Sequence, residues 1–346
     1  MKNKIMRVAS FIQKITNIAS HKINNINKIK VAGSCNHLII SGLILTIIVS
    51  LSSCKGGFTR TDESPTRGDI RIISDESFQP LIDTEIDTFT SLYTNAKIKP
   101  LYKPEYDVIN DFMNDSVKVI VTSKKLTEDQ IQYLRDSLII ARTISFAWDA
   151  LVLVTNKENH DTLIKYEDIR NIFLGNLKRW NELDSSSDLG DIRVIFDNTK
   201  SGNIRYFKEL FEIETSLPDN FFAVNNNPEV IDFVSRNKDA LGIVSVSWIS
   251  DVDDSLSRSF DDKVNIVGVS PRFYYDGTYY RPSPGSIYTK DYPFVREIYF
   301  ISRETFNGLG SGLIQWATAE QGQTIVLKSG LVPATMPIRL VQIKTE

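Results

Sequence analysis

Three short polar segments are suited to binding an anion, because each places hydroxyl side chains at or near the start of a predicted helix. They read SDESFQP at 74–80, TSKKL at 122–126 and DNTKSGN at 197–203. Free backbone N–H groups and the positive end of the helix dipole attract anions at such positions without any net positive charge. The candidate ligand-binding residues in these loops are Asp75, Glu76, Ser77, Phe78, Ser123, Lys124, Asp197, Asn198, Ser201, Gly202 and Asn203. Helix capping alone is the competing interpretation, since Ser, Thr and Asp are also the commonest N-caps.

Alternating strand and helix patterns position these loops. The segment DIRIISD at 69–75 is typical of a strand that ends in turn-forming residues, and the segment after it carries Leu81, Ile82, Ile86 and Phe89 at helical spacing. The same order of strand and helix recurs along the chain, which predicts an α/β fold: an open, mostly parallel sheet with helices on both faces. Ligands bind at the carboxyl ends of strands in such sheets, so we expect the three loops to converge.

The supply of metal ligands and catalytic bases is small. The chain contains His21, His37 and His160 together with Cys35 and Cys54, so a single histidine lies beyond position 54. This count argues against a zinc site of the Cys/His type, and we expect no metal and no cofactor. A serine hydrolase is a weaker alternative, because no G-x-S-x-G elbow is present and His160 stands alone as a base. We therefore expect a binding protein and not an enzyme.

Charge is distributed unevenly along the chain. It carries 40 Lys and Arg against 43 Asp and Glu, for a net charge of −3, but residues 1–53 hold seven basic residues and no acid. The remainder therefore has 33 basic and 43 acidic residues, a net charge of −10. A body this acidic and without a basic cluster is poorly suited to nucleic acid, since phosphate contacts dominate that affinity.

The N-terminal region predicts export and a lipid anchor. The segment 38–51 is an uncharged run of 14 residues that follows Lys28 and Lys30, and a helix that spans a bilayer needs about 20 residues. The sequence LSSC that ends at Cys54 resembles a bacterial lipobox. We thus expect residues 1–53 to be a lipoprotein signal peptide, Cys54 to be lipidated and 54–67 to be a flexible tether. A short anchoring helix with an incidental cysteine is the alternative interpretation.

Three longer segments resemble one known family. They are LIKYEDIRNIFLGNLKRWNEL at 163–183, NKDALGIVSVSWI at 237–249 and GQTIVLKSGLVPA at 322–334. Together they are similar to the phosphate-type substrate-binding proteins of ABC importers, the PstS-like branch of the periplasmic binding proteins. The resemblance implies two α/β lobes joined by a hinge, with the ligand held in the cleft between them. It assigns 68–147 and 252–346 to lobe 1, and 148–251 to lobe 2.

The resemblance also implies a function. The expected protein is a monomeric receptor that captures phosphate or a similar oxyanion and presents it to an ABC permease. It would be anchored to a membrane of the bacterial cell envelope through Cys54, with its soluble domain in the periplasm. A receptor of the same fold for a different small ligand, or a sensing module without transport, are the alternatives.

Several residues depart from the family's ligand-binding pattern. Ser77–Phe78 falls on its first ligand pair and Ser201–Gly202–Asn203 on its Ser-Gly-Thr, with Asn203 in place of the threonine. Asp197 stands where the family has its phosphate-binding arginine, and Glu105 stands where a Ser-Gly-rich loop is expected. Lys124 is the expected source of compensating positive charge. Phosphate is therefore the leading ligand, held beside several added carboxylates.

Aromatic residues outside the loops carry further predictions. Trp180 is predicted to lie in the core, and Trp148 with Asp149 on the predicted hinge strand to face the cleft. The segment PRFYYDGTYYRPSPG at 271–285 is too rich in tyrosine and too interrupted by proline for a core helix. We expect it to be a packed loop, with a permease contact as the alternative.

Overall fold

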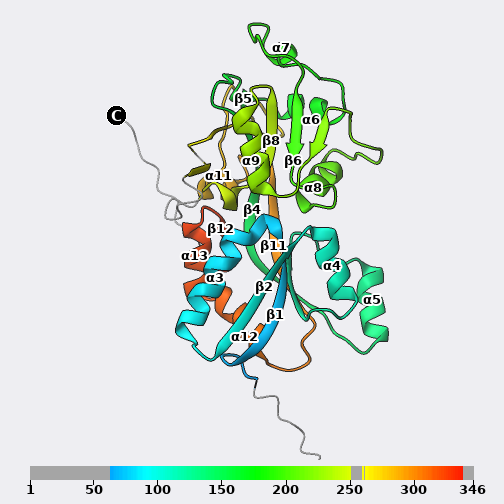
Figure 1. The fold of residues 1–346 in the computed structure, drawn as a ribbon, viewed down its shortest axis with the longest axis vertical. Helices are drawn as coiled ribbons and strands as arrows, with labels where there is room; N and C mark the ends of the chain where they lie inside the picture. The colour runs from blue at the N-terminus through cyan, green and yellow to red at the C-terminus, as the bar shows by residue number, and fades with distance from the viewer. Residues whose placement is uncertain (1–62, 251–258, 261, 338–346) are drawn as a thin grey trace, which may run out of the picture. The chain divides into compact units, whose positions relative to one another are not determined.

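The computed structural model describes residues 63–250, 259–260 and 262–337, which belong to one compact unit that begins at Asp62 (Figure 1). The expected signal peptide, Cys54 and most of the expected tether lie outside the described residues. Among the described residues, no helix combines the length and apolar character that crossing a membrane requires.

A single sheet runs through the unit in the order β2-β1-β3-β11-β4-β8-β6-β7, with β9 and β12 paired to β4. Its strands are β1 (Gly68–Asp75), β2 (Ala96–Lys103), β3 (Val119–Thr122), β4 (Arg142–Asn156), β6 (Arg193–Phe196), β7 (Phe221–Ala223), β8 (Ala240–Ser245), β9 (Val264–Ile266), β11 (Val295–Ser302) and β12 (Val332–Pro333). A separate parallel pair joins β5 (Leu163–Ile164) to β10 (Gly268–Val269).

One half of the sheet, which we call lobe 1, contains β1, β2 and β3. These strands are parallel, as the alternation of strand and helix predicts, and β11 lies antiparallel beside β3. Figure 1 shows the helices of this lobe on both sides of the strands. They are α3 (Gln79–Leu92), α4 (Glu105–Met113), α5 (Glu128–Asp136), α12 (Leu309–Ala317) and α13 (Glu320–Lys328). Helices α12 and α13 are separated by a break at Thr318 and Ala319.

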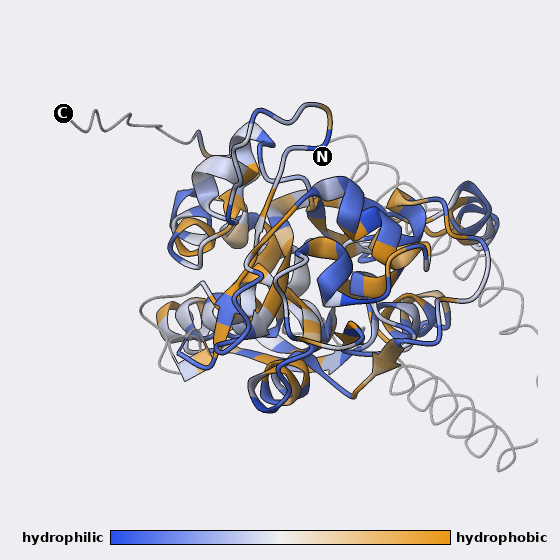
Figure 2. Ribbon diagram, turned by 90° about the horizontal axis from the view of Figure 1, so that it is seen from above, coloured by the Kyte–Doolittle hydropathy of each residue, from blue (hydrophilic) through white to orange (hydrophobic). Residues whose placement is uncertain are grey.

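The other half, lobe 2, is built on β6, β7 and β8, which are parallel to one another. Its helices are α6 (Tyr166–Phe173), α7 (Trp180–Leu183), α8 (Gly202–Leu210) and α9 (Asn227–Arg236), with α11 (Pro284–Thr289) between β10 and β11. Trp180 is fully buried and donates its indole N–H to the carbonyl of Asp239, so its predicted place in the core is confirmed. In Figure 2 the apolar strands lie in the middle, with helices of mixed hydropathy around them.

Strand β4 connects the two lobes. Its first part, Arg142 to Ala150, pairs with β11, and its second part, Leu151 to Asn156, pairs with β8 and β9. Residues 150–155 are all buried, which suits a continuous run of β-branched and apolar residues that is covered on both faces. A strand shared by both lobes is the connection expected of a hinge, and it places Asp149 where the lobes meet.

The pairing of β9 and β10 supports a later end for lobe 2 than the one that the resemblance implies. Residues 252–346 are expected in lobe 1, but β9 pairs with the lobe 2 part of β4 at Val154–Asn156, and β10 pairs with β5. We therefore propose that the chain returns to lobe 1 near Phe294, at the start of β11, and not at residue 252.

The aromatic segment 271–285 is less packed than we expect from the sequence. Phe273 is 88% exposed, and Tyr274 and Tyr275 are more than half exposed. The segment is anchored at Tyr280, which pairs with Val269 in a backbone bridge. The prediction of a packed loop is therefore wrong for residues 273–275.

Candidate functional site

The first candidate loop joins β1 to α3 through a short 3-10 helix, η1 (Glu76–Phe78). Asp75 caps this helix, because its Oδ1 accepts a hydrogen bond of 3.0 Å from the backbone N–H of Ser77. Asp75, Ser77 and Phe78 are fully buried. The Oδ2 of Asp75 has no hydrogen-bond partner among the described residues.

The second loop begins helix α8 in lobe 2. Ser201 is its N-cap: the side chain accepts from the backbone N–H groups of Asn203 and Ile204, and donates to Asp197 Oδ1 at 2.6 Å. Capping, the competing interpretation of these serines, therefore applies to Ser201. Asp197, Ser201 and Asn203 are nonetheless buried in the region where the lobes meet.

The two loops touch across the cleft. Ser77 Oγ of lobe 1 donates to Asn203 Oδ1 of lobe 2 at 3.0 Å. Ser247 Oγ, in the short helix η2 (Val246–Trp248) after β8, donates to the carbonyl of Ser77 at 2.8 Å. The lobes are therefore closed on one another at this point, and the buried hydroxyls face the junction.

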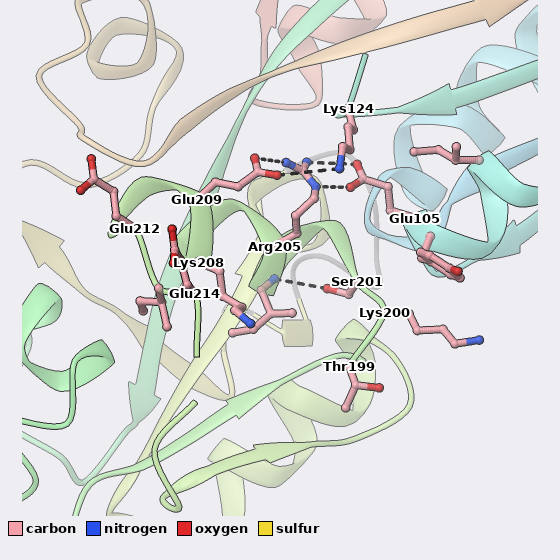
Figure 3. Close-up of a pocket in the computed structure, with 14 residues that line it drawn as sticks. Glu105, Lys124, Thr199, Lys200, Ser201, Arg205, Lys208, Glu209, Glu212 and Glu214 are labelled. Atoms are coloured by element: carbon pink, nitrogen blue, oxygen red, sulfur yellow. Dashed lines mark hydrogen bonds and ion pairs between the residues drawn. The ribbon is translucent and has the colours of Figure 1, made fainter. Parts of the chain in front are cut away.

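The third loop, after β3, is held by Glu105 at the start of α4. Its Oε1 accepts from Thr122 Oγ1 at 3.0 Å and from the backbone and side chain of Ser123 at 3.1 and 2.6 Å. Arg205 of α8 donates to the same carboxylate from lobe 2, and to Ser123 Oγ at 2.9 Å. Figure 3 shows Arg205 directed between Glu105 and Glu209. The donors expected to bind an anion here are thus bound to a carboxylate of the chain itself.

Glu76 occupies a comparable position at the start of α9. Its Oε2 accepts from Asn227 Nδ2 at 2.6 Å, and its carboxylate accepts from the backbone N–H of Asn227 at 3.3 and 3.4 Å. A carboxylate is favourable at a helix N-terminus because it complements the unpaired N–H groups and the helix dipole. Lobe 1 therefore supplies a carboxyl group to a helix terminus of lobe 2.

A buried arginine on β11 lies at the same junction. Arg296 donates from Nε to Asp149 Oδ2 at 2.8 Å, and Asp149 Oδ1 accepts from Ser245 at 2.9 Å. The guanidinium carbon lies 4.8 Å from the centre of the Phe78 ring. Nη1 and Nη2 are both buried and have no hydrogen-bond partner among the described residues.

Several acids at this junction titrate far from their ordinary range. Burial raises the pKa of Asp75 to about 7, of Glu76 to about 8 and of Asp197 to about 6. Neighbouring carboxylates raise the pKa of Asp75 and Glu76 further, whereas the charge of Arg296 lowers the pKa of Asp75 and Asp197. Burial alone would raise the pKa of Glu105 too, but Arg205 outweighs it and holds that pKa below its usual value.

Two cavities flank the junction. A groove of about 800 Å³ lies between α4 and α8, and Glu105, Lys124, Arg205 and Glu209 are among the residues that line it (Figure 3). A smaller cavity of about 310 Å³ lies beside the first and second loops. Its lining includes Glu76, Tyr102, Asp197, Asn198 and Trp248.

The structure brings most of the predicted site residues together. Buried residues at the junction are Asp75, Ser77, Phe78, Asp197, Ser201, Gly202 and Asn203, and Glu76 and Ser123 are half-buried beside them. Asn198 lines the smaller cavity. Lys124 does not reach the junction: its Nζ lies 3.9 Å from Glu209 Oε1, and its side chain is 39% exposed. The charged groups at the junction are instead Arg205 and Arg296.

Those two arginines and the bonding of Asn227 are absent from our sequence-based candidates. A signal for Arg296 does exist: in VREIYFIS it occupies the same alternate positions as Ile298 and Phe300, which are the buried face of the strand. An arginine at an inward-facing strand position is rare unless it is paired. No local pattern distinguishes Arg205 from other charged helix residues. Among the described residues, no cluster of His, Cys, Asp and Glu could hold a metal ion.

Two lobes of mixed α/β structure around a buried polar junction define the class of two-lobed solute-binding folds. A family model, the PBP superfamily domain, matches residues 59–321. The chain belongs to this family.

The chain is also similar to several individual proteins, by sequence and by structure. The chain is 22% identical over 261 residues to the phosphate-binding protein PstS of Borreliella burgdorferi, covering 73% of this chain and 85% of that protein. It is 20% identical to PstS of a Staphylococcus aureus strain, over 70% of this chain and 74% of that protein. A structure of a phosphate ABC transporter substrate-binding protein from Clostridium perfringens, with bound phosphate, superposes with a TM-score of 0.66 at 22% identity, covering 77% of this chain and all of that chain. The structure of an ABC-type phosphate transport receptor from Vibrio cholerae superposes with a TM-score of 0.58 at 18% identity, covering 78% of this chain and all of that chain.

Proposed function

We propose that this chain is the solute-binding protein of an ABC importer and that it captures phosphate between its two lobes. One observation carries the proposal: Ser77 of lobe 1 and Asn203 of lobe 2 meet in a fully buried junction. Opening at β4 exposes this junction, and closing buries whatever lies within it. Such closure couples occupancy to a shape that a permease can recognise.

The donors at the junction suit an oxyanion. Hydroxyls of Ser77, Ser123 and Ser201 lie at or near the starts of helices. Opening of the lobes releases Ser77 Oγ from Asn203 and the backbone N–H of Asn227 from Glu76, and both donors then become available to an anion. The added acids oppose an anion less than their number suggests. With pKa values raised to about 7 and 8, Asp75 and Glu76 carry a proton for much of the time near neutral pH. A protonated carboxyl donates a hydrogen bond to an oxyanion, and an ionised one accepts from its hydroxyl.

Membership of the family and the relatives named for phosphate support the choice of ligand. The test is isothermal titration calorimetry with phosphate, and with sulfate as the comparison anion, on protein expressed from its full sequence and purified in mild detergent. We expect saturable phosphate binding. Phosphate at 100 times its Kd should raise the free energy of unfolding by about 2.7 kcal/mol, which is seen as a higher melting temperature. Phosphate is not the ligand if it produces no binding heat and no rise in melting temperature while another small solute produces both.

We also propose that the mature protein begins at a lipidated Cys54 and is held at a membrane of the cell envelope as a monomer. The LSSC sequence after the apolar run supports this proposal. Metabolic labelling with an alkyne fatty acid tests it: the wild-type protein should be labelled and membrane-bound, and Cys54→Ser unlabelled. Equal labelling of the two proteins would contradict the anchor.

A further inference from the structure

The buried guanidinium of Arg296 has two nitrogen atoms without a hydrogen-bond partner among the described residues. The side chain of Arg296 is 3% exposed, and only its Nε has a partner, the fully buried Asp149. Nη1 and Nη2 have no hydrogen-bond partner among the described residues. Leaving charged donors buried and unpaired is costly, so native proteins pair such groups unless a ligand or water completes the site.

Arg296 lies among the groups already assigned to the cleft. Its guanidinium is stacked over Phe78 of the first loop, 4.8 Å from the ring centre. Asp75, three residues earlier, also has an unpartnered buried oxygen, Oδ2. No ion pair within 4.0 Å joins Arg296 to Asp75 among the described residues. An unpaired cation and an unpaired acceptor therefore line one buried region without satisfying each other.

We propose that Arg296 is the residue that binds the charge of the oxyanion ligand, through its free Nη1 and Nη2. This proposal rests on the proposed function and extends it to a residue on β11 of lobe 1. The family resemblance places the phosphate-binding arginine at the position of Asp197 in lobe 2, which here carries the opposite charge. Arg296 supplies that missing cation from the other lobe. A guanidinium fork matches two oxygens of a tetrahedral oxyanion, which a lysine head cannot do.

Asp149 is the positioning residue in this arrangement. By accepting from Nε at 2.8 Å, it fixes the plane of the guanidinium and leaves the two Nη groups directed elsewhere. Ser245 of lobe 2 donates to the other carboxylate oxygen at 2.9 Å, so the orientation of Arg296 depends on contacts from both lobes.

The experiment compares Arg296→Lys with Arg303→Lys. Arg303 is a matched control: it is also buried, its guanidinium carbon lies 5.7 Å from a phenylalanine ring, and it donates to the carbonyl of Phe112 in lobe 1. Lysine at 296 keeps a charge beside Asp149 but loses the fork. We expect Arg296→Lys to weaken phosphate binding by about 10- to 100-fold in calorimetry, the range for lost hydrogen bonds to charged groups. Arg303→Lys should bind within about 2-fold of wild type, because its contacts are remote from the junction.

The outcomes separate this inference from the function on which it rests. If wild-type protein binds phosphate and folded Arg296→Lys binds equally well, the role of Arg296 is wrong and the receptor function stands. If wild-type protein does not bind phosphate, the proposed function fails first. Should Arg296→Lys not fold, a crystal structure of the wild-type protein with phosphate decides: an oxygen of phosphate within hydrogen-bond distance of Nη1 or Nη2 is expected, and separations above 4 Å from both would overturn the proposal.

Discussion

Arg205 of α8 and Glu105 of α4 form an ion pair that joins the two lobes. Arg205 donates from Nε to one oxygen of the carboxylate and from Nη2 to the other at 3.3 Å. The side chain of Glu105 is 2% exposed and that of Arg205 is 21% exposed. Since the pair is largely shielded from water, we expect it to contribute to closure of the cleft more than an ordinary surface pair would.

Glu105→Gln should therefore favour the open form. The change removes the charge that Arg205 faces while keeping an acceptor for Ser123. We expect phosphate affinity to fall by roughly 10-fold, equivalent to about 1.4 kcal/mol of lost closure energy. Calorimetry measures the affinity, and small-angle X-ray scattering should show that the phosphate-bound variant is less compact than the bound wild type.

Asp107→Asn provides the control, because Asp107 forms another lobe-to-lobe ion pair, with Lys200 at 3.0 Å, and this pair is more exposed. It should change affinity by no more than about 2-fold. The pH dependence gives a second check. Because the pKa of Glu105 is held below its usual value in the folded protein, its contribution is present above about pH 4.5 and is lost as pH falls through that lower pKa. Equal affinities for Glu105→Gln and wild type would contradict the role of the pair.

The helix-capping role of Ser201 and its proposed role as a ligand donor can be separated experimentally. Ser201→Ala removes the N-cap of α8 and should lower the free energy of unfolding by about 1 kcal/mol. If Ser201 also binds the ligand, phosphate affinity should fall about 10-fold in addition. Thermal unfolding with and without phosphate measures both effects.

Thr127→Ala is the matched control for this change. Thr127 is the N-cap of α5, where it forms a capping box with Gln130 outside the cleft. It should lower stability by a similar amount and leave phosphate affinity unchanged. If Ser201→Ala behaves in the same way as Thr127→Ala, Ser201 is a cap alone.

The sequence predicts the fold well where periodicity is local. The loops after β1, β3 and β6 meet as the parallel-sheet rule requires, and Trp180 is buried as predicted. Each of these features depends on a short pattern of residues or on a general rule about sheets. The break between α12 and α13 has a weaker signal, because no proline or charge run marks it in the sequence.

The pairing of the charged residues at the junction could not be predicted from local sequence patterns. Arg205 and Glu105 are separated by 100 positions, and Arg296 and Asp149 by 147. Nothing in the local sequence selects these pairs, and Lys124, the cation nearest to a candidate loop in the sequence, turns outward to Glu209. The assignment of strands to lobes is similarly long-range, since β9 and β10 pair with strands more than 100 positions away.

Glu85 on α3 should make the stability of the protein depend on pH. It is 1% exposed, neither carboxylate oxygen has a hydrogen-bond partner among the described residues, and burial raises its pKa to about 9. The folded protein therefore keeps the proton where the unfolded chain has released it. Stability falls as pH rises from about 4.5 toward 9. Glu85→Gln should remove this loss and raise the free energy of unfolding on the order of 3 kcal/mol at pH 8.

Urea unfolding from pH 4 to pH 8 tests this prediction. The curves of wild type and Glu85→Gln should converge near pH 4 and separate as pH rises, whereas Glu128→Gln, at an exposed position on α5, should follow wild type within about 0.5 kcal/mol. Phosphate affinity should be the same in all three proteins. Parallel curves for Glu85→Gln and wild type would show that Glu85 ionises normally in the folded protein.

Gly202 allows the lobes to approach at the start of α8. A Cβ atom at this position would lie 2.7 Å from Asp75 Oδ2 and 3.0 Å from the carboxylate of Glu105, both on lobe 1. Gly202→Ala should thus obstruct closure while leaving lobe 2 intact, because alanine is the better helix former in its first turn. We expect phosphate affinity to fall by at least about 10-fold with no loss of thermal stability in the absence of ligand.

Gly190→Ala is the matched control, since no atom lies within 4 Å of a Cβ at that position in the same lobe. It should bind phosphate as the wild type does. The comparison separates two requirements on residue 202. If Gly202→Ala is destabilised without ligand, the glycine is needed to fold α8. If it folds and binds normally, the two loops do not approach as closely in the ligand-bound state as they do here, and the ligand must hold Ser77 and Asn203 apart. Only a folded protein with weakened binding supports direct closure of the lobes over phosphate.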